Sequence, residues 1–312
     1  MKAAQINEYG GTDVLKTNDN VPKPSAGEGQ VLVEVRAASA NPIDWKVREG
    51  YLKEMVPLTF PATLGGDVSG VVSELGAGVD AFRIGDEVYG LANTLSGTGS
   101  FAEFTPVAVT SLAPKPKNLS FEEAAAVPLA ATSAYQALTD EIGLKSGQKI
   151  LIHGGAGGIG SLAVQIAKHF GAYVAATVSA KDLEFVKSLG ADEVIDYKSQ
   201  DFTQIIRDYD AVFDTTGGGV AEKSLTVLKK GGTLVSMADK VDEQLAKDTG
   251  VTAISLMTQV TTERLTAISK MIDEGAFTVQ IDKVFPLDEA GKALGYIQES
   301  HHGKSVIKVK GA

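Results

Sequence analysis

Three glycines with the spacing G-x-G-x-x-G are the residues whose types and spacing point most directly to chemistry. They lie in the segment His153-Gly154-Gly155-Ala156-Gly157-Gly158-Ile159-Gly160. In a strand-to-helix turn the first glycine allows the tight turn, the second lets backbone amides approach a pyrophosphate, and the third lets the helix pack closely on the strand. The first helical amides add N–H donors and a partial positive charge for phosphates. The pattern therefore predicts a dinucleotide site, and the alternative is a glycine-rich turn without a ligand. The residues predicted to hold the dinucleotide here are Gly155, Ala156, Gly157, Gly158, Ile159 and Gly160.

The end of the next predicted strand, at residues 173–178, indicates which dinucleotide binds. An NAD site usually carries an acidic residue there to hold the ribose 2′-hydroxyl. This chain has Ser179 and Lys181 instead, which can donate to a 2′-phosphate and neutralise it. Tyr197 ends the following strand at the same edge, within reach of the same phosphate. We interpret Asp182 as the start of a helix, where a carboxylate favours the dipole. The residues predict NADPH, and the alternative for Lys181 is a solvated surface side chain.

The elements that must position these residues alternate between strands and helices. Apolar strand patterns and amphipathic helix patterns follow one another from about residue 149 to residue 237. This βαβ rhythm predicts a parallel, doubly wound sheet. The predicted strands cover residues 149–153, 173–178, 193–197, 211–214 and 233–237, and the predicted helices cover 159–170, 183–189, 220–228 and 262–274.

The first third of the chain has a different pattern. Short β-branched runs bounded by glycines, at residues 30–37, 66–76 and 100–104, predict a small β-barrel or sandwich. A capping box at Ser120 then predicts a helix over 122–127, interrupted by Pro128, with a further helix over 132–138. The tail is again rich in strand residues. We therefore predict domains at 1–123 and 124–262, with the segment 263–312 returning to the first domain.

Composition excludes several classes of function. The net charge of −10 argues against nucleic-acid binding, because no basic face is evident to neutralise phosphates. There is no cysteine, which excludes disulfides, thiolate nucleophiles and zinc sites built on sulfur, and the chain has only four histidines. No apolar run approaches the roughly 20 residues needed to span a bilayer, and the N-terminus lacks a signal-peptide pattern. We expect a cytoplasmic globular protein that contacts neither nucleic acid nor membrane.

Several segments together resemble the medium-chain dehydrogenase/reductase superfamily, and within it the zinc-independent quinone oxidoreductase (zeta-crystallin-like) branch. The resemblance covers nearly the whole chain. It implies an α/β fold in which a GroES-like β-barrel, completed by the C-terminal segment, packs on a doubly wound Rossmann domain, with the active site between the two. The segments that carry it are residues 40–50, 61–72, 76–79 and 82–90, the glycine loop, residues 188–192 and residues 303–306.

Metal ligands of the zinc-dependent relatives are missing. Those relatives place a cysteine near the position of Asn41, a Gly-His-Glu triplet where Gly65-Gly66-Asp67 stands, and a lobe with four cysteines. Without these groups too few ligands remain for a tetrahedral zinc site, so we expect no metal. Without a Lewis acid, alcohol oxidation is disfavoured at neutral pH. The resemblance then implies hydride transfer from NADPH to an acceptor that is already electron-poor.

Further site residues follow from the resemblance. Asn41 and Tyr51 are expected to line the substrate cleft and polarise the acceptor carbonyl, with Tyr51 acting alternatively as a proton source through a water. Asn41 has the alternative of a turn residue before Pro42, and Tyr51 that of a cleft wall. Thr132 and Met237 are expected beside the nicotinamide. Lys304 could approach the cofactor or lie exposed at the surface.

The leading hypothesis is an NADPH-dependent reductase of quinones or α,β-unsaturated carbonyls such as alkenals and enones. An enoyl-thioester reductase is the alternative within the enzyme class. An NADPH-binding regulatory protein with little turnover is the alternative outside it. The superfamily often forms dimers, and the apolar strand predicted over 251–256 is a candidate for pairing in a homodimer.

Overall fold

The computed structural model describes residues 1–299 and 302–310. The chain divides into two compact units. The first unit contains residues 1–129, 260–274 and, within the described part, 279–299 and 302–310; the second contains residues 130–259 and 275–278. The first division thus falls slightly after the one expected from sequence, and the tail belongs to the same unit as the head.

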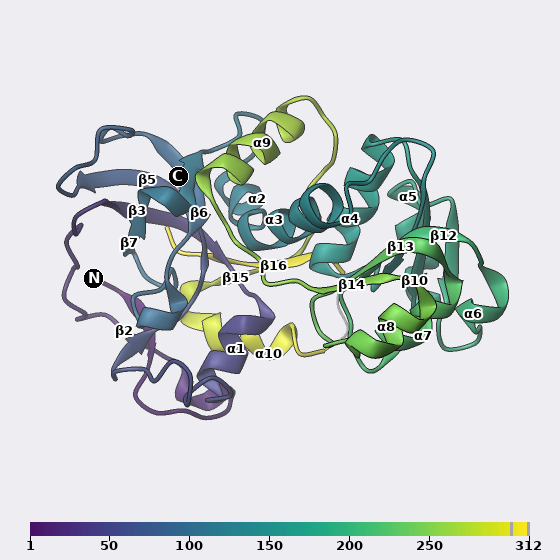
Figure 1. Ribbon diagram of the computed structural model, residues 1–312. Coiled ribbons are helices and arrows are strands. Elements are labelled where there is room, and N and C mark those ends of the chain that lie inside the picture. Colours follow the sequence, from purple (N-terminus) through teal and green to yellow (C-terminus); the bar gives the residue numbers. More distant parts are fainter. Residues whose placement is uncertain (300–301, 311–312) are drawn as a thin grey trace. The chain divides into compact units, whose positions relative to one another are not determined.

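The first unit is built on a seven-stranded sheet with the order β15-β16-β3-β5-β6-β8, in which β7 also pairs with β3 (Figure 1). Alternating valines of β3 and β5 form one side of its core, with Phe82 and Leu112. The tail strand β16 runs antiparallel to β3, so the sheet joins residues from both ends of the chain. The bounds are β3 Gln30–Ser39, β5 Asp67–Leu75, β6 Glu87–Leu91, β7 Phe104–Ala108, β8 Leu112–Pro114, β15 Ile281–Pro286 and β16 Lys304–Lys308.

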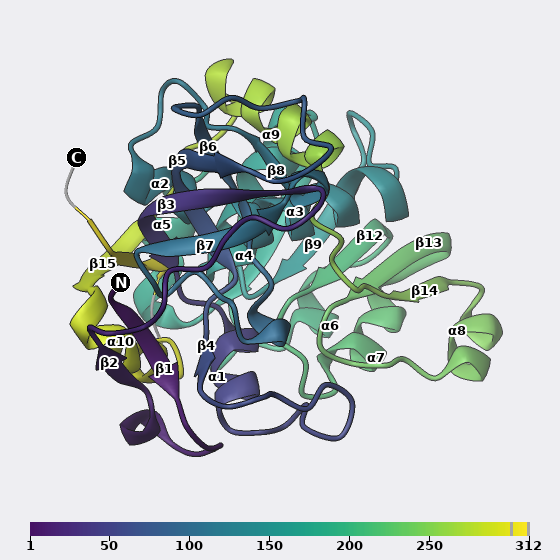
Figure 2. The same cartoon turned by 90° about the vertical axis from the view of Figure 1, so that its left-hand side faces the viewer.

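A smaller sheet and several helices complete this unit. The small sheet has the order β2-β1-β4, and Figure 2 shows β1 and β2 beside α10. The helix α1 begins at Pro42, with Asn41 and Asp44 forming a capping box at its N-terminus. The bounds are β1 Ala3–Ile6, β2 Lys16–Asn18, β4 Ala62–Thr63, α1 Pro42–Arg48, α2 Phe121–Ala125, α9 Thr262–Asp273 and α10 Ala290–Tyr296.

The second unit is a six-stranded parallel sheet with the order β11-β10-β9-β12-β13-β14. This is the doubly wound order, with its switch point between β9 and β12. Figure 1 shows α4 and α5 on one face and α7 and α8 on the other. The bounds are β9 Lys149–His153, β10 Tyr173–Val178, β11 Glu193–Asp196, β12 Tyr209–Asp214, β13 Leu228–Ser236, β14 Thr252–Ser255, α3 Pro128–Gln136, α4 Gly158–His169, α5 Leu183–Ser188, α6 Phe202–Ile205, α7 Val220–Ser224 and α8 Glu243–Thr249.

The predicted elements of the second unit are confirmed, most of them to within two residues. The predicted helix over 220–228 is shorter, because a 3₁₀ turn follows Ser224 and β13 already begins at Leu228. Pro128 does not interrupt a helix. It begins α3, and at the first position of a helix the missing N–H of proline costs no helical hydrogen bond. In the first unit the strand expected over 100–104 begins only at Phe104. None of the helices in residues 1–299 and 302–310 has the length and apolar character needed to cross a bilayer.

Candidate active site

The glycine loop lies at the carboxyl end of β9, beside the switch point of the sheet. Gly154 has a φ of +75°. The amides of Gly154 and Gly155 both donate to the carbonyl of Thr177, each at 3.1 Å, which ties the loop to the end of β10. Helix α4 then starts without a capping side chain at Gly157. Its first N–H groups therefore lack intrahelical partners and are suited to an anion.

The surroundings of each glycine show which of them the fold needs. A Cβ on Gly160 would lie 2.1 Å from the carbonyl oxygen of Gly154, so only glycine lets α4 approach the loop. A Cβ on Gly155 would lie 2.9 Å from the Cβ of Ala176. The tight turn expected at Gly155 has its positive φ at Gly154, and Gly155 allows close packing. At Gly157 the nearest atom, the carbonyl oxygen of Gly154, would be 3.5 Å away, an ordinary van der Waals distance, so a Cβ would fit there.

This arrangement fits a dinucleotide. Protein atoms leave no room for a Cβ at Gly155 and Gly160, whereas a Cβ would fit at Gly157, the position where backbone approaches a pyrophosphate in such loops. A second observation comes from Thr132 on α3. Its Oγ1 is fully buried and has no hydrogen-bond partner in residues 1–299 and 302–310. A buried hydroxyl without a partner is costly unless a bound group satisfies it.

At the carboxyl ends of β10 and β11, the predicted phosphate residues lie close to one another. The amide of Tyr197 donates to the carbonyl of Val178 at 3.1 Å, which places Tyr197 next to Ser179. Lys181 is exposed, and the Tyr197 side chain is 58% exposed. Asp182 is buried and makes no capping bond at the start of α5. It stands at the N-cap position of α5, as expected, and its carboxylate also accepts from the hydroxyl of Ser179 at 2.5 Å, a contact that the sequence did not indicate.

Met237 follows the last residue of β13. Its amide donates to the carbonyl of Asp214 at 3.0 Å, so it lies beside the end of β12 at the switch point. The Asp214 carboxylate is buried and accepts from the Ser236 hydroxyl at 2.8 Å and from the Thr216 amide at 2.9 Å. Sequence reasoning missed this aspartate. The sequence feature that could have indicated Asp214 is an acidic residue at the end of an apolar strand, β12.

A buried polar cluster occupies the centre of the first unit. Asn41 donates through Nδ2 to Asp67 at 2.8 Å and accepts, through Oδ1, a short hydrogen bond from Lys304. The Lys304 ammonium lies 3.4 Å from Asp67 and 3.4 Å from the carbonyl of Ala40. Asp67 also accepts from Ser39 at 2.7 Å and from the Leu129 amide at 2.9 Å. Of the two alternatives for Lys304, exposure at the surface is excluded, because this residue is only 5% exposed.

Asp44 lies at the margin of this cluster. Its Oδ2 accepts from the amide of Asn41 at 2.9 Å, completing the capping box of α1. Burial raises the pKa of Asp44 to about 7, and the negative charge of Asp67 adds to the rise, while Lys304 opposes it. Asn41 therefore begins a helix and at the same time belongs to a network of buried charges. Asp44 and Asp67 were quoted in the sequence motifs without a role, although acids within apolar runs are a recognisable signal.

Tyr51 is not part of the buried cluster. It follows α1 in a turn, is 70% exposed, and packs edge-on against Trp45 with ring centres 5.9 Å apart. The structure thus gives the two predicted catalytic residues different settings. Asn41 is held by buried charges, and Tyr51 is displayed on the surface of the first unit.

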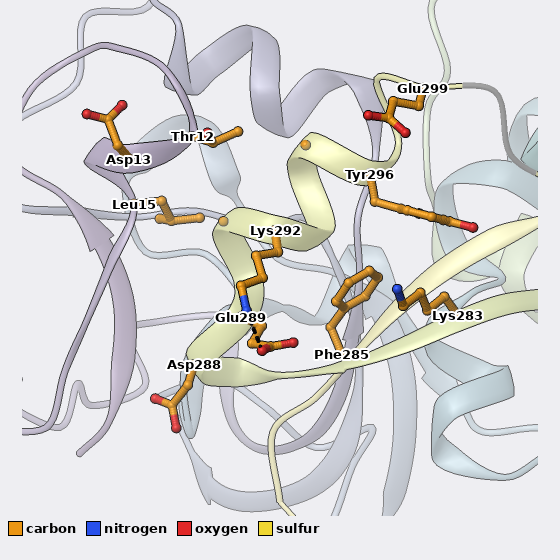
Figure 3. Close-up of a pocket in the computed structure, with 12 residues that line it drawn as sticks. Thr12, Asp13, Leu15, Lys283, Phe285, Asp288, Glu289, Lys292, Tyr296 and Glu299 are labelled. Carbon is orange, nitrogen blue, oxygen red and sulfur yellow. Dashed lines mark hydrogen bonds and ion pairs between the residues drawn. The ribbon is translucent and has the colours of Figure 1, made fainter.

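A pocket of about 510 Å³ lies in the first unit beside α10 (Figure 3). Lys283, Phe285 and Tyr296 line one side of it, and Lys292 pairs with Glu289 at 2.7 Å. None of the predicted site residues lines this pocket, so we do not assign it to the reaction. In the described ranges 1–299 and 302–310, no three histidine, aspartate or glutamate side chains come together as a metal site.

Comparison with known families and proteins agrees with this geometry. Residues 27–117 match the Alcohol dehydrogenase GroES-like domain, and residues 189–307 match the Zinc-binding dehydrogenase family. The predicted GroES-like unit is thereby confirmed. The chain is 47% identical over 248 residues to 2-methylene-furan-3-one reductase of Solanum lycopersicum, a match that covers 77% of this chain and 63% of that relative.

Two further similarities extend over almost the whole chain. The chloroplastic NADPH-dependent alkenal/one oxidoreductase of Arabidopsis thaliana is 38% identical over 98% of this chain and 79% of its own length. The structure of the quinone oxidoreductase from Coxiella burnetii superimposes with a TM-score of 0.91 at 37% identity, covering 99% of both chains. The resemblance inferred from the sequence motifs is therefore confirmed.

Proposed function

The chain belongs to the quinone oxidoreductase branch of the medium-chain dehydrogenase/reductase superfamily, and on this premise we propose that it is an NADPH-dependent, zinc-independent reductase of quinones and α,β-unsaturated carbonyls. The observation that carries the proposal is the glycine loop, in which packing leaves no room for a Cβ at Gly155 and Gly160 but leaves room for one at Gly157. The relatives named for alkenal/one, furanone and quinone substrates supply the acceptor class.

The proposed cofactor residues all belong to the second unit except Lys304. Gly155 to Gly160 hold the pyrophosphate through backbone amides and the start of α4. Ser179, Lys181 and Tyr197 lie at the strand ends where a 2′-phosphate is recognised. Thr132 and Met237 are proposed to face the nicotinamide, and the unpartnered Thr132 hydroxyl supports this. When bound, NADPH supplies the hydride.

Besides its proposed contact with the cofactor, Lys304 is proposed to position Asn41. Its ammonium is held among Asn41, Asp67 and the carbonyl of Ala40, and so it fixes the amide of Asn41. Because the side chain is already held in one orientation, it loses less conformational entropy when its amide donates a hydrogen bond to a carbonyl oxygen. We propose that Asn41 orients the acceptor carbonyl and that the exposed Tyr51 hydroxyl delivers a proton from solvent.

Zinc-independence rests on the residue types. The positions that hold zinc ligands in zinc-dependent relatives carry Asn41, Gly66 and Asp67 here, and Asp67 already accepts hydrogen bonds from Ser39, Asn41 and Leu129. Elemental analysis of the purified protein tests whether it contains zinc. Turnover measured before and after treatment with a metal chelator tests whether activity needs a metal. Stoichiometric zinc, with activity lost on its removal, would refute the metal-free mechanism.

The first experiment mixes purified protein with NADPH or NADH and a panel of quinones, alkenals and enones, and follows absorbance of the reduced nicotinamide. We expect oxidation of NADPH without added metal. NADPH binding without turnover on any acceptor would instead indicate the regulatory function, and turnover restricted to enoyl thioesters would indicate an enoyl-thioester reductase. Asn41→Ala or Tyr51→Phe with unchanged turnover would remove that residue from the chemistry.

We also propose a homodimer formed through β14. This strand is the last in the order of the second sheet, and within the described ranges it pairs only with β13. An unpaired edge of this kind is a template for another strand. A monomeric mass in solution would reject the proposal.

A cytoplasmic location is our further proposal, based on the cysteine-free composition. Subcellular fractionation with an antibody against the chain tests it. Recovery in an organelle fraction would reject it.

A further inference from the structure

We propose that Asp182 is a specificity-determining residue that weakens the preference for NADPH over NADH, so that the chain binds both dinucleotides with affinities of similar magnitude. This inference rests on the proposed function, because it concerns the same cofactor site. It names the residue that limits cofactor selection, which the strand-end sequence alone does not reveal.

The first argument is the direction of one hydrogen bond. Ser179 donates its hydroxyl proton to Oδ2 of Asp182 at 2.5 Å. A hydroxyl has a single proton, and an ionised carboxylate can only accept. The remaining lone pairs of Ser179 can accept a hydrogen bond from a ribose 2′-hydroxyl, but the serine has no second proton to donate to a 2′-phosphate.

The second argument is the burial of this pair. Asp182 is 4% exposed and lies in the 3₁₀ turn that directly follows β10. A rotation of the Ser179 hydroxyl toward a phosphate would remove one hydrogen bond from a buried carboxylate, which is costly. The orientation of the hydroxyl is therefore set by the protein before any dinucleotide arrives.

The third argument is the balance of charge at this edge of the sheet. Lys181 and Lys198 are exposed next to the ends of β10 and β11, and Asp182 and Asp196 lie beside them. The Asp196 carboxylate accepts from the hydroxyl of Ser199 at 2.6 Å. Two acids thus offset two lysines where a 2′-phosphate would need a net positive charge.

Equilibrium binding of NADPH and of NADH, followed by nicotinamide fluorescence, tests the proposal without any turnover. For the wild type we expect the two dissociation constants to lie within about tenfold of each other. Asp182→Asn keeps an acceptor for Ser179 but removes the charge, so it should raise the preference for NADPH by about three- to tenfold.

Ser179→Ala provides a second, independent test. If the serine accepts from the ribose 2′-hydroxyl, this variant weakens NADH binding by about three- to tenfold and changes NADPH binding little. If the serine donates to a 2′-phosphate, NADPH binding falls instead, and the proposal is overturned. Should Asp182→Asn fail to fold, Ser179→Ala still decides.

Glu193→Gln is the matched control, because it removes one negative charge at the opposite end of β11. It should leave the ratio of the two dissociation constants unchanged. An unchanged ratio in Asp182→Asn, or an equal change in Glu193→Gln, would overturn the role of Asp182 while leaving the proposed function intact. If the wild type binds neither dinucleotide, both the proposed function and this inference fail.

Discussion

The glycine loop of the second unit and the buried polar cluster of the first unit position their functional groups in different ways. The loop is a continuous run of eight residues, five of them glycines, and packing leaves no room for a Cβ at Gly155 and Gly160. The cluster takes Asn41, Asp67 and Lys304 from three separate strands or strand ends, and it works through side-chain charges. A local site depends on steric exclusion, whereas an assembled site depends on charge compensation. The two therefore fail in different ways when they are altered.

The largest effect is expected from Lys304→Met, which leaves the buried carboxylate of Asp67 without its cation. We expect the free energy of unfolding to fall by about 3–5 kcal/mol, as when one partner of a buried pair is removed. Urea denaturation measures this. Lys310→Met is the control, because its half-exposed side chain pairs with Glu34 near the surface and should contribute about 0–1 kcal/mol. Equal losses in the two variants would contradict the assembled-site interpretation.

The steric interpretation of the loop predicts a smaller effect for Gly160→Ala. The added Cβ would overlap the carbonyl of Gly154, so we expect a loss of about 1–3 kcal/mol of stability and weaker NADPH binding. In Gly157→Ala the Cβ makes only an ordinary van der Waals contact, at 3.5 Å from the carbonyl oxygen of Gly154. Stability should then change by less than about 1 kcal/mol while NADPH binding weakens, because this glycine faces the ligand. If both variants lose stability equally, the loop is not divided as we describe. Thermal unfolding and fluorescence titration give the two readouts.

The two regions should also respond oppositely to pH, beginning with Asp44. Because burial raises its pKa to about 7, from an ordinary value of 3.8, the folded chain keeps a proton that the unfolded chain releases. This contribution to stability is therefore lost as the pH rises from about 4 to 7. The wild type should therefore lose stability between pH 5 and pH 8. In Asp44→Asn we expect this loss of unfolding free energy to be smaller by about 1–2 kcal/mol. An unchanged pH profile from urea denaturation would contradict this.

His153, at the end of β9, should give the smallest effect and the opposite sign. Burial lowers its pKa to about 4, although Asp214 opposes the change. The ring bonds to Thr177 and Ser224, each at 2.9 Å. The unfolded chain takes up a proton below pH 6.5, so stability is lost as the pH falls from 6.5 toward 4. In His153→Gln the loss of unfolding free energy between pH 6.5 and pH 4 should be smaller by about 1 kcal/mol. The slope of the profile is the measurement, and a slope equal to that of the wild type would refute the prediction.

The glycine loop and the buried polar cluster also differ in how far the sequence predicts them. The βαβ rhythm, the glycine loop and the capping box at Ser120 were predictable, because each depends on contacts within a few residues. The Ser120 hydroxyl accepts from the Glu123 amide at 3.2 Å, as the four-residue pattern requires. The sequence did not show that the positive φ of the tight turn lies at Gly154 rather than Gly155, because adjacent glycines look alike until neighbouring strands limit their space.

By itself, the sequence determined the doubly wound unit and the position of the glycine loop, because backbone geometry and hydrophobic periodicity act over short separations, and the resemblance of its motifs indicated the family. Only the tertiary structure decided that Lys304 is buried against Asn41 and Asp67, since these residues are far apart in the chain and meet through the pairing of β16 with β3. It also decided that the Asp182 carboxylate accepts a hydrogen bond from Ser179. Hydrogen-bond direction depends on where a turn points its side chains, and residue types alone do not specify that orientation.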